Sequence, residues 1–324
     1  MSDDANAPPA NGPPAAPPAD GPRAVVGLGE LLWDEFPADG GGTTRRPGGA
    51  PANVAFQCHQ LGLSGRALSR VGDDADGRDL VSFLAEKGLP TDLIQTDPDL
   101  PTGRVSVTHG ADGPEYVIHQ PVAWDALEAT DAGREEIAGA AAICFGSLAQ
   151  RDFRSLTAIR ELISGRPQRV RAVFDVNLRQ NFFTADLLRE SLKRANVLKL
   201  NEAEVPVVAR LLDLPAEPGE FLLQAADRWR LDAACVTRGP DGCRVLKAGD
   251  DPVNVPAEPV QVADTVGAGD AFTAGLIFAL LADADAERCG RFANAVGGLV
   301  ASRGGAMPEL RAEFAALKAK HGFA

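Results

Sequence analysis

The alternation of short apolar runs with longer amphipathic runs constrains the fold of this chain most strongly. "AVVGLG" at 24–29 predicts a buried strand, and "ANVAFQCHQLG" at 52–62 predicts a helix that Gly62 ends. The same order returns in "AAAICFGSLA" at 140–149, followed by "RDFRSLTAIRELISG" at 151–165. Strands that alternate with helices predict an α/β fold with a doubly wound, mainly parallel sheet and helices on both faces.

Two segments depart from this alternation. "RVSVTHGADGPEYVI" at 104–118 alternates around "GADG", which predicts a hairpin and therefore a small β appendage. Residues 1–22 are a Pro/Ala tract without an apolar run, so they predict a disordered tail. The remaining residues, 23–324, form one α/β domain in this interpretation.

Composition and charge exclude several classes of protein. The net charge of −13 disfavours nucleic acid and anionic membranes as partners, and no apolar run is long enough to span a membrane. Five cysteines without a CxxC pair predict free thiols in a reducing compartment, hence a cytoplasmic protein, and the four histidines lack metal-ligand spacing.

"DTVGAGDAFTAGL" at 264–276 places three small residues and an acid, Asp270, at the start of an apolar helix. A helix N-terminus presents unpaired amides, and glycine and alanine let an anionic group approach them. Asp270 could then accept the proton of a hydroxyl that attacks phosphorus. The alternative interpretation is that Asp270 only caps the helix.

Polar residues also follow the predicted strands. Parallel strands end at one edge of a sheet, and doubly wound sheets bind ligands at that edge. These residues are therefore expected to converge there: Asp34, Asn177, Arg179, Asn201, Glu204, the segment 237–242 and Asp270.

Two long motifs, in order, resemble the signatures of the pfkB family, the ribokinase/fructokinase-like carbohydrate kinases. The first is "RPGGAPANVAFQCHQLG" at 46–62 and the second is "DTVGAGDAFTAGL". The resemblance implies a ribokinase-like fold whose small β lid, from about 35–47 and 100–123, closes over the sugar. It also implies ATP as cosubstrate, Mg²⁺, K⁺ as an activator, and a homodimer that pairs through the lid.

The resemblance further implies roles on the sugar side of the site. Asp270 would be the catalytic base and "GELLWD" would provide Asp34 for sugar hydroxyls, while Asn53 would contact the sugar or else only start a helix. "DVNLR" resembles the family's D-P-N-x-R, with Val176 in place of proline. The residues implied are Gly267, Ala268 and Gly269 for the anion hole, and Asp34, Gly48, Gly49, Asn53, Arg104, Asn177 and Arg179 for the substrate.

On the nucleotide side, "VTRGPDG" resembles the family's T-x-G-x-x-G, and "LNEAEV" contains its N-x-x-E. Glu204 would act on magnesium through water, because magnesium keeps its waters. Asp264 would bind a monovalent cation or else only form a turn, and Asn294 would contact adenine or else only be a buried helical asparagine. The nucleotide-binding residues implied are Asn201, Thr237, Gly239, Gly242 and Asn294.

These observations predict an ATP-dependent sugar kinase that phosphorylates a primary hydroxyl, most simply that of fructose. A 2-keto-3-deoxy sugar acid would need an arginine clamp, for which Arg104 and Arg179 are candidates. A nucleoside would need an aromatic surface, for which Tyr116 and Trp124 are candidates. A catalytically silent sugar- or nucleotide-binding regulator would not need Asp270, and a dinucleotide dehydrogenase would need an early GxGxxG that this chain lacks.

Deletion of residues 1–22 is expected to leave the melting temperature and the activity unchanged, because a Pro/Ala tract has no apolar surface to pack. Differential scanning calorimetry and a kinase assay on the full and shortened chains would check this. A clear fall in the melting temperature of the shortened chain would show instead that the tail packs against the domain.

Overall fold

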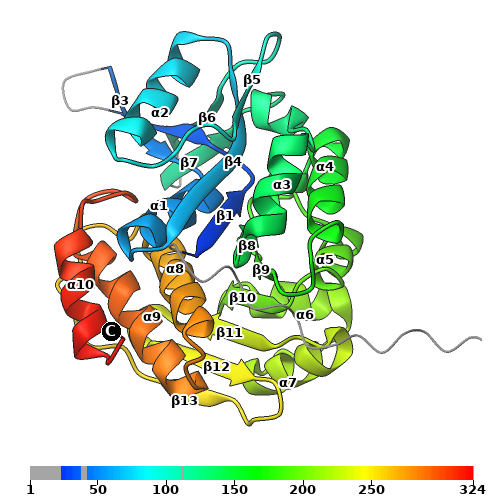
Figure 1. Cartoon of the computed structure of the whole chain (residues 1–324), viewed down its shortest axis with the longest axis vertical. Helices are drawn as coiled ribbons and strands as arrows, with labels where there is room; N and C mark the ends of the chain where they lie inside the picture. The colour runs from blue at the N-terminus through cyan, green and yellow to red at the C-terminus, as the bar shows by residue number, and fades with distance from the viewer. Residues whose placement is uncertain (1–22, 38–41, 111–112, 324) are drawn as a thin grey trace, which may run out of the picture.

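The computed structural model describes residues 23–37, 42–110 and 113–323, in which a large sheet lies beside a small one (Figure 1). The large sheet has the strand order β13-β12-β11-β10-β9-β8-β1-β4-β5, with all neighbours parallel except at β12 and β13. The predicted doubly wound, mainly parallel sheet is therefore confirmed. Its strands are β1 Ala24–Leu28, β4 Ser64–Gly72, β5 Ile94–Asp97, β8 Ala142–Phe145, β9 Arg171–Asp175, β10 Val197–Asn201, β11 Ala233–Thr237, β12 Cys243–Lys247 and β13 Val253–Val255.

Helices cover both faces of the large sheet because successive strand residues point to opposite sides. Val26 belongs to the apolar cluster that contains residues of α3 to α7, whereas its neighbour Val25 belongs to the cluster that contains residues of α1, α8, α9 and α10. Figure 1 shows these two layers on either side of the sheet. The helices are α1 Ala50–Gln60, α2 Ala75–Glu86, α3 Asp131–Gly139, α4 Phe153–Ser164, α5 Ala185–Leu192, α6 Val205–Leu212, α7 Pro218–Trp229, α8 Ala268–Leu281, α9 Ala286–Ala301 and α10 Arg311–Lys320.

The small sheet has the order β3-β2-β6-β7 and overlaps the segments predicted for the lid. Its strands are β2 Leu32–Pro37, β3 Thr43–Gly48, β6 Gly103–Gly110 and β7 Gly113–Ile118. Asp34 therefore lies inside β2 of the small sheet, not at the end of β1. The chain leaves β1 at Gly29, whose φ of +151° and close approach to Pro51 favour glycine.

Helix α1 packs directly on the backbone of two strands. A Cβ atom on Gly27 of β1 would lie 2.0 Å from the carbonyl oxygen of Pro51, and one on Gly65 of β4 would lie 2.0 Å from that of Ala55. Real Cβ contacts are never so short, so both positions require glycine. This close packing fixes the N-terminus of α1 beside the carboxyl end of β1.

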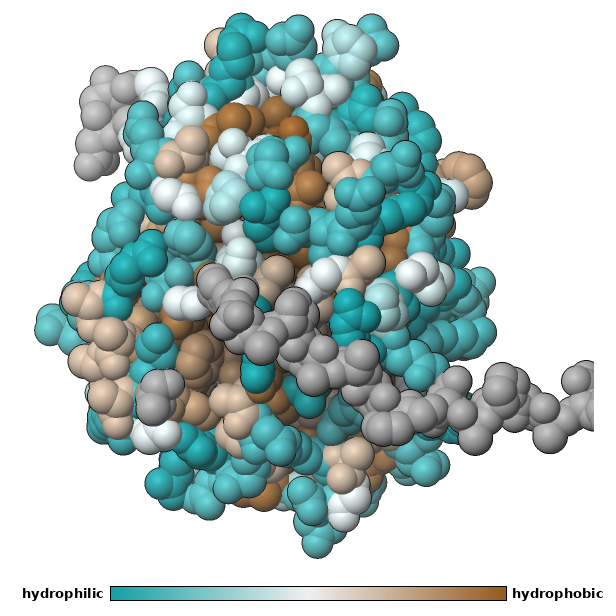
Figure 2. All heavy atoms as spheres, viewed as in Figure 1, coloured by the Kyte–Doolittle hydropathy of each residue, from teal (hydrophilic) through white to brown (hydrophobic). Residues whose placement is uncertain are grey.

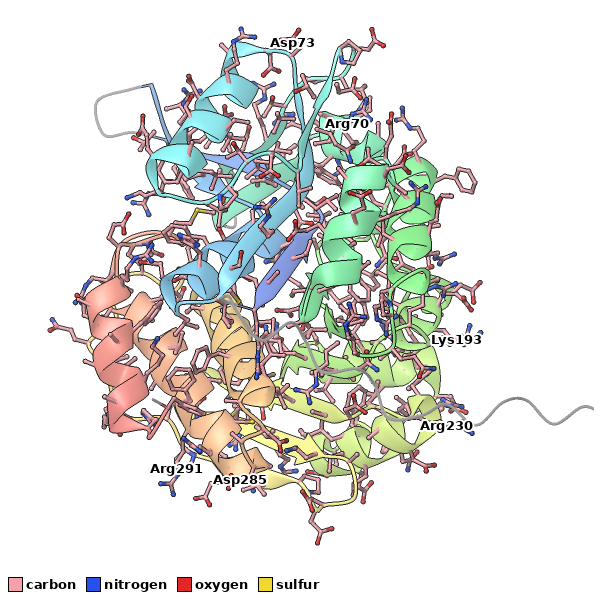
Figure 3. The ribbon with its side chains drawn as sticks, in the orientation of Figure 1. Arg70, Asp73, Lys193, Arg230, Asp285 and Arg291 are labelled. Atoms are coloured by element: carbon pink, nitrogen blue, oxygen red, sulfur yellow. The ribbon has the colours of Figure 1, made fainter. Side chains whose placement is uncertain are left out.

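Hydrophilic side chains cover most of the face shown in Figure 2, and the labelled Asp73, Lys193, Asp285 and Arg291 lie at the outline of the molecule in Figure 3. Within the described ranges, no helix is long and apolar enough to cross a membrane. The five cysteines are buried, unpaired thiols, as predicted: Cys58, Cys144, Cys235, Cys243 and Cys289. The tail 1–22 lies outside the described residues.

Gly27→Ala is expected to lower the free energy of unfolding by about 3 kcal/mol, because the added methyl group overlaps the Pro51 carbonyl and forces α1 away from β1. Urea denaturation would measure the change. Gly139→Ala is the matched control: this exposed residue ends α3, and a Cβ there meets nothing within 4 Å. Equal stabilities of the two variants would contradict the proposed close packing.

Candidate active site

The candidate site lies at the carboxyl ends of the parallel strands, where α1 and α8 begin. The strand order reverses between β8 and β1, which is where doubly wound sheets bind ligands. Asn53 of α1 donates a hydrogen bond from Nδ2 to Oδ2 of Asp270 in α8, at 2.7 Å. Asn53 is the fourth residue of α1, and Gly49 occupies the capping position, so Asn53 is not the helix cap.

The first turn of α8 presents backbone amides toward this edge. Gly267 caps the helix at φ +76°, and a Cβ there would lie 2.5 Å from Ala306. The first helical hydrogen bond runs from the Ala271 amide to the Gly267 carbonyl, so the amides of Gly269 and Asp270 precede it. The Ala268 amide donates to the Thr265 carbonyl at 3.2 Å. The amides of Gly269 and Asp270 are therefore the ones best placed for an anion.

Asp270 lies above a buried ion pair. Lys199 of β10 donates to both carboxylate oxygens of Asp175 at 3.0 Å, and Thr273, one turn after Asp270, donates to Oδ2 of Asp175 at 2.7 Å. Burial, followed by the charge of Asp175, raises the pKa of Asp270 to about 6, although Asn53 and Lys199 oppose the shift. A carboxylate with this pKa is ionised at neutral pH and is a stronger base than an exposed aspartate.

The sugar-side residues gather around Asp34. A Cβ on Gly48 would lie 2.2 Å from Oδ2 of Asp34, and a Cβ on Gly49, at φ +112°, would lie 2.3 Å from the Glu30 carbonyl oxygen. Gly48 is therefore required for the Asp34 carboxyl group to lie where it does, and Gly49 is required for the close approach of its backbone to Glu30. Burial raises the pKa of Asp34 to about 6, because the charge of Arg179 only partly offsets it.

Glu30, which the sequence analysis did not assign, is a third carboxyl group of the site. Its side chain is 3% exposed, and burial raises its pKa to about 7, against backbone hydrogen bonds and the charge of Arg179. Its Oε2 atom, like Oδ1 of Asn53, is buried and has no hydrogen-bond partner among the described residues. Two unpaired acceptors beside Asp270 fit a ligand that brings hydroxyl donors. Glu30 stands four residues before Asp34 in "GELLWD", which was the available signal.

The two arginines predicted for substrate binding, Arg104 and Arg179, lie in different places relative to the site. The positive charge of Arg179 lowers the pKa of Glu30, Asp34 and Asp270, so Arg179 faces the site. Arg104 pairs in register with Trp33, whose side chain points away from the face that carries Asp34. Nη1 of Arg104 accordingly lies 4.0 Å from Oε1 of Glu35 on that opposite face. The structure therefore does not bring Arg104 to the site. Asn177, at φ +43°, follows β9 in the same loop as Arg179.

Asn201 and Glu204 form one compact turn after β10. The Glu204 amide donates to Oδ1 of Asn201 at 3.0 Å, while the Glu204 carboxylate accepts from the amides of Asn201 and Leu178. Each carboxylate oxygen keeps a lone pair for water, so Glu204 fits an outer-sphere role toward magnesium. In the part of the chain that the structure describes, no cluster of three acids, cysteines or histidines could hold a metal directly.

Two of the predicted nucleotide-side residues, Asn294 and Gly242, meet at the end of β13. Asn294 of α9 donates to the carbonyl oxygens of Val255 and Pro256 at 3.1 and 3.3 Å. A Cβ on Gly242, at φ +87°, would lie 2.1 Å from the same Val255 oxygen. Gly239 lies at φ +56° beside open space, after Thr237 at the end of β11. Asn294 thus fixes the backbone of this loop, and its contact with adenine stays a prediction.

Asp264 is held by three donors. Oδ2 accepts from Arg46 Nη1 at 2.8 Å and from the Gly305 amide at 3.0 Å, and Oδ1 accepts from the Val266 amide at 3.0 Å. These backbone bonds and Arg46 lower the pKa of Asp264 despite partial burial. Oδ2 of Asp264 therefore already has a positive partner in Arg46, whereas Oδ1 accepts a single hydrogen bond.

Comparison with known proteins identifies the family of this chain. Residues 32–312 match the family described as pfkB family carbohydrate kinase. A protein of Pyrococcus horikoshii named as a sugar kinase is 31% identical over 296 residues, which are 87% of this chain and 91% of that protein. Fructokinase-1 of Oryza sativa subsp. japonica is 29% identical over 91% of this chain and 96% of its own length. The structure of a Xylella fastidiosa fructokinase with bound ATP has a TM-score of 0.81 at 25% identity, covering 92% of this chain and 99% of that one.

Fold and site together define an ATP-dependent carbohydrate kinase with a ribokinase-like fold. The resemblance read from the two motifs is thereby confirmed. The chain belongs to the pfkB family of carbohydrate kinases.

The value of kcat/KM is expected to fall as the pH falls through about 6, because Asp270 must be ionised to accept a proton and its pKa is about 6. Asn53→Ala removes a donor that stabilises the ionised form of Asp270, so the midpoint of the fall in kcat/KM should move to higher pH. Rate measurements between pH 5 and pH 8 on both enzymes would check the shift. An unmoved midpoint would mean that a group other than Asp270 controls the fall in kcat/KM.

Proposed function

We propose that the protein transfers the γ-phosphoryl group of ATP to a primary hydroxyl of fructose, with Asp270 as the base. The hydrogen bond between Asn53 and Asp270, beside the amides at the start of α8, carries this proposal. It joins a base and a site for negative charge to a residue of the sugar-side motif. A protein that only binds sugar or nucleotide has no need for this combination.

In this mechanism Asn53 orients the Asp270 carboxylate toward the acceptor hydroxyl. The hydroxyl proton passes to Asp270 while its oxygen forms a bond to the γ-phosphorus, and the bond between that phosphorus and ADP breaks. The amides of Gly269 and Asp270 donate hydrogen bonds to the negatively charged oxygens of the transferred group. Magnesium, when bound with ATP, neutralises phosphate charge, and Glu204 would hold one of its waters.

A neutral sugar suits the charges of the site. Glu30, Asp34 and Asp270 place three carboxyl groups in the site, and Arg179 is the cation whose charge acts on all three. A sugar acid would bring a further negative charge against them, and Arg104 lies on the other face of β2. A ketohexose brings no charge, and its hydroxyls can donate to the free acceptor atoms of Glu30 and Asn53.

A nucleoside is supported less well. Trp124, one of the two aromatic candidates, is 1% exposed and lies under the guanidinium of Arg151, 4.0 Å from the ring centroid. It therefore offers no free face for a base. The side chain of Tyr116 lies outside the described residues. The family includes relatives named as fructokinases from rice and Klebsiella pneumoniae, which also supports a neutral sugar.

The small sheet is the proposed lid over the sugar, because β2 carries Asp34 and β3 leads into Gly48 and Gly49. Closure of such a lid would exclude water and so limit the transfer of phosphate to water. Pairing of two lids in a homodimer and a cytoplasmic location stay predictions.

Fructose is expected to give a kcat/KM above those for 2-keto-3-deoxygluconate, ribose and adenosine, measured with ATP and magnesium under one condition. A preference of more than tenfold for the acid, about 1.4 kcal/mol of transition-state binding, would contradict the choice of a neutral sugar.

Asp270→Asn should lower kcat by about 10²–10⁴-fold while ATP still binds. Asp283→Asn, a surface residue whose side chain is 92% exposed, is the matched control and should change nothing.

A further inference from the structure

The ion pair between Arg46 and Asp264 joins the small sheet to the loop that precedes α8. Arg46 belongs to β3, two residues before Gly48, and reaches the first residue of "DTVGAGD" at 2.8 Å. The segment from β3 into α1 contacts this motif a second time, where Asn53 donates to Asp270. The turn that bears the amides of the proposed anion site is therefore held at both of its ends.

Asp264 also anchors the loop that packs behind this turn. Its Oδ2 accepts from the amide of Gly305, and the next residue, Ala306, lies so close to Gly267 that no side chain fits between them. The charge on Asp264 thus fixes both the turn 265–269 and the loop around 305. The Arg46 guanidinium is the positive partner of this carboxylate.

We infer that the Arg46 guanidinium supplies the positive charge that a monovalent cation would otherwise supply at Asp264, so that the small sheet itself orders the anion-binding turn. Arg46 is a positioning residue, since it acts through Asp264 and the turn. This inference rests on the proposed role of the turn in phosphoryl transfer. It replaces the expected activation by potassium with a dependence on one side chain.

Two features of the pair make the inference testable. The Arg46 side chain is 48% exposed, and ion pairs this exposed contribute little to global stability, so Arg46→Ala should fold. The neighbouring Arg45 is a matched control because it points to the other face of β3. Arg45 is 40% exposed, pairs with Asp76 and Asp79 of α2, and lies over the ring of Trp33.

The first measurement is kcat and KM of the wild type, Arg46→Ala, Arg46→Lys and Arg45→Ala in potassium, sodium or tetramethylammonium chloride at one ionic strength. Wild type and Arg45→Ala should differ by less than about twofold among the salts. Arg46→Ala should lose about tenfold in kcat in tetramethylammonium, less than the loss on removing a direct oxyanion donor. Its KM for the sugar should change little, potassium should restore kcat, and Arg46→Lys should resemble the wild type.

The second measurement does not depend on turnover. Potassium, compared with tetramethylammonium, should raise the melting temperature of Arg46→Ala but not that of the wild type. Strong potassium activation of the wild type, a full kcat of Arg46→Ala without potassium, or a loss that no alkali cation reverses would each overturn the inference. If none of the tested sugars is phosphorylated, the proposed substrate fails, and the melting temperatures still decide the role of Arg46.

Discussion

The buried ion pair between Lys199 and Asp175 is the interaction on which the site depends. Both side chains are almost fully buried, on neighbouring strands at the centre of the large sheet. Buried charges are tolerated only when they are paired and hydrogen-bonded, and removal of one partner typically costs about 3–5 kcal/mol. Asp175 also accepts from Thr273, so the pair fixes the N-terminal half of α8 onto the sheet.

The same pair sets the electrostatics above it. Lys199 has a raised pKa because the charges of Asp175, Glu204 and Asp270 outweigh its desolvation. It therefore stays charged and counters the negative groups on three different elements. Together with the Asn53 hydrogen bond and the charge of Arg179, the charge of Lys199 opposes the rise in the pKa of Asp270 that burial and Asp175 cause.

The sequence predicted the architecture well because alternating apolar runs report burial directly, as Val25 and Val26 show on the two faces of β1. It also drew attention to Asp270 and Asn53, because both lie in long motifs, and the structure brings these two side chains together. It did not predict Glu30 or the Lys199–Asp175 pair, because their importance arises from neighbours distant in sequence. A lysine within the apolar run "VLKLN" was the one available signal.

The misplacement of Arg104 has a different cause. The hairpin pattern in the sequence shows which side chains alternate between the two faces of the strand. Which of these faces turns toward the site depends on the register of that strand with its neighbour in the sheet. Here Arg104 is paired with Trp33, and a shift of one residue would have placed it with Asp34. The order of residues along one strand does not contain that information.

The five buried thiols have a consequence for the chemistry of the folded protein. All five lie in the apolar layer that α1, α8, α9 and α10 form against the sheet, and the other layer contains none of them. Burial raises the pKa of Cys58, Cys144 and Cys235, and that of Cys289 to about 11, so thiolate is scarce. Alkylating reagents and peroxide react with thiolate, so labelling must wait until this layer opens. The rate of labelling would thus report the opening of one half of the molecule separately from the other.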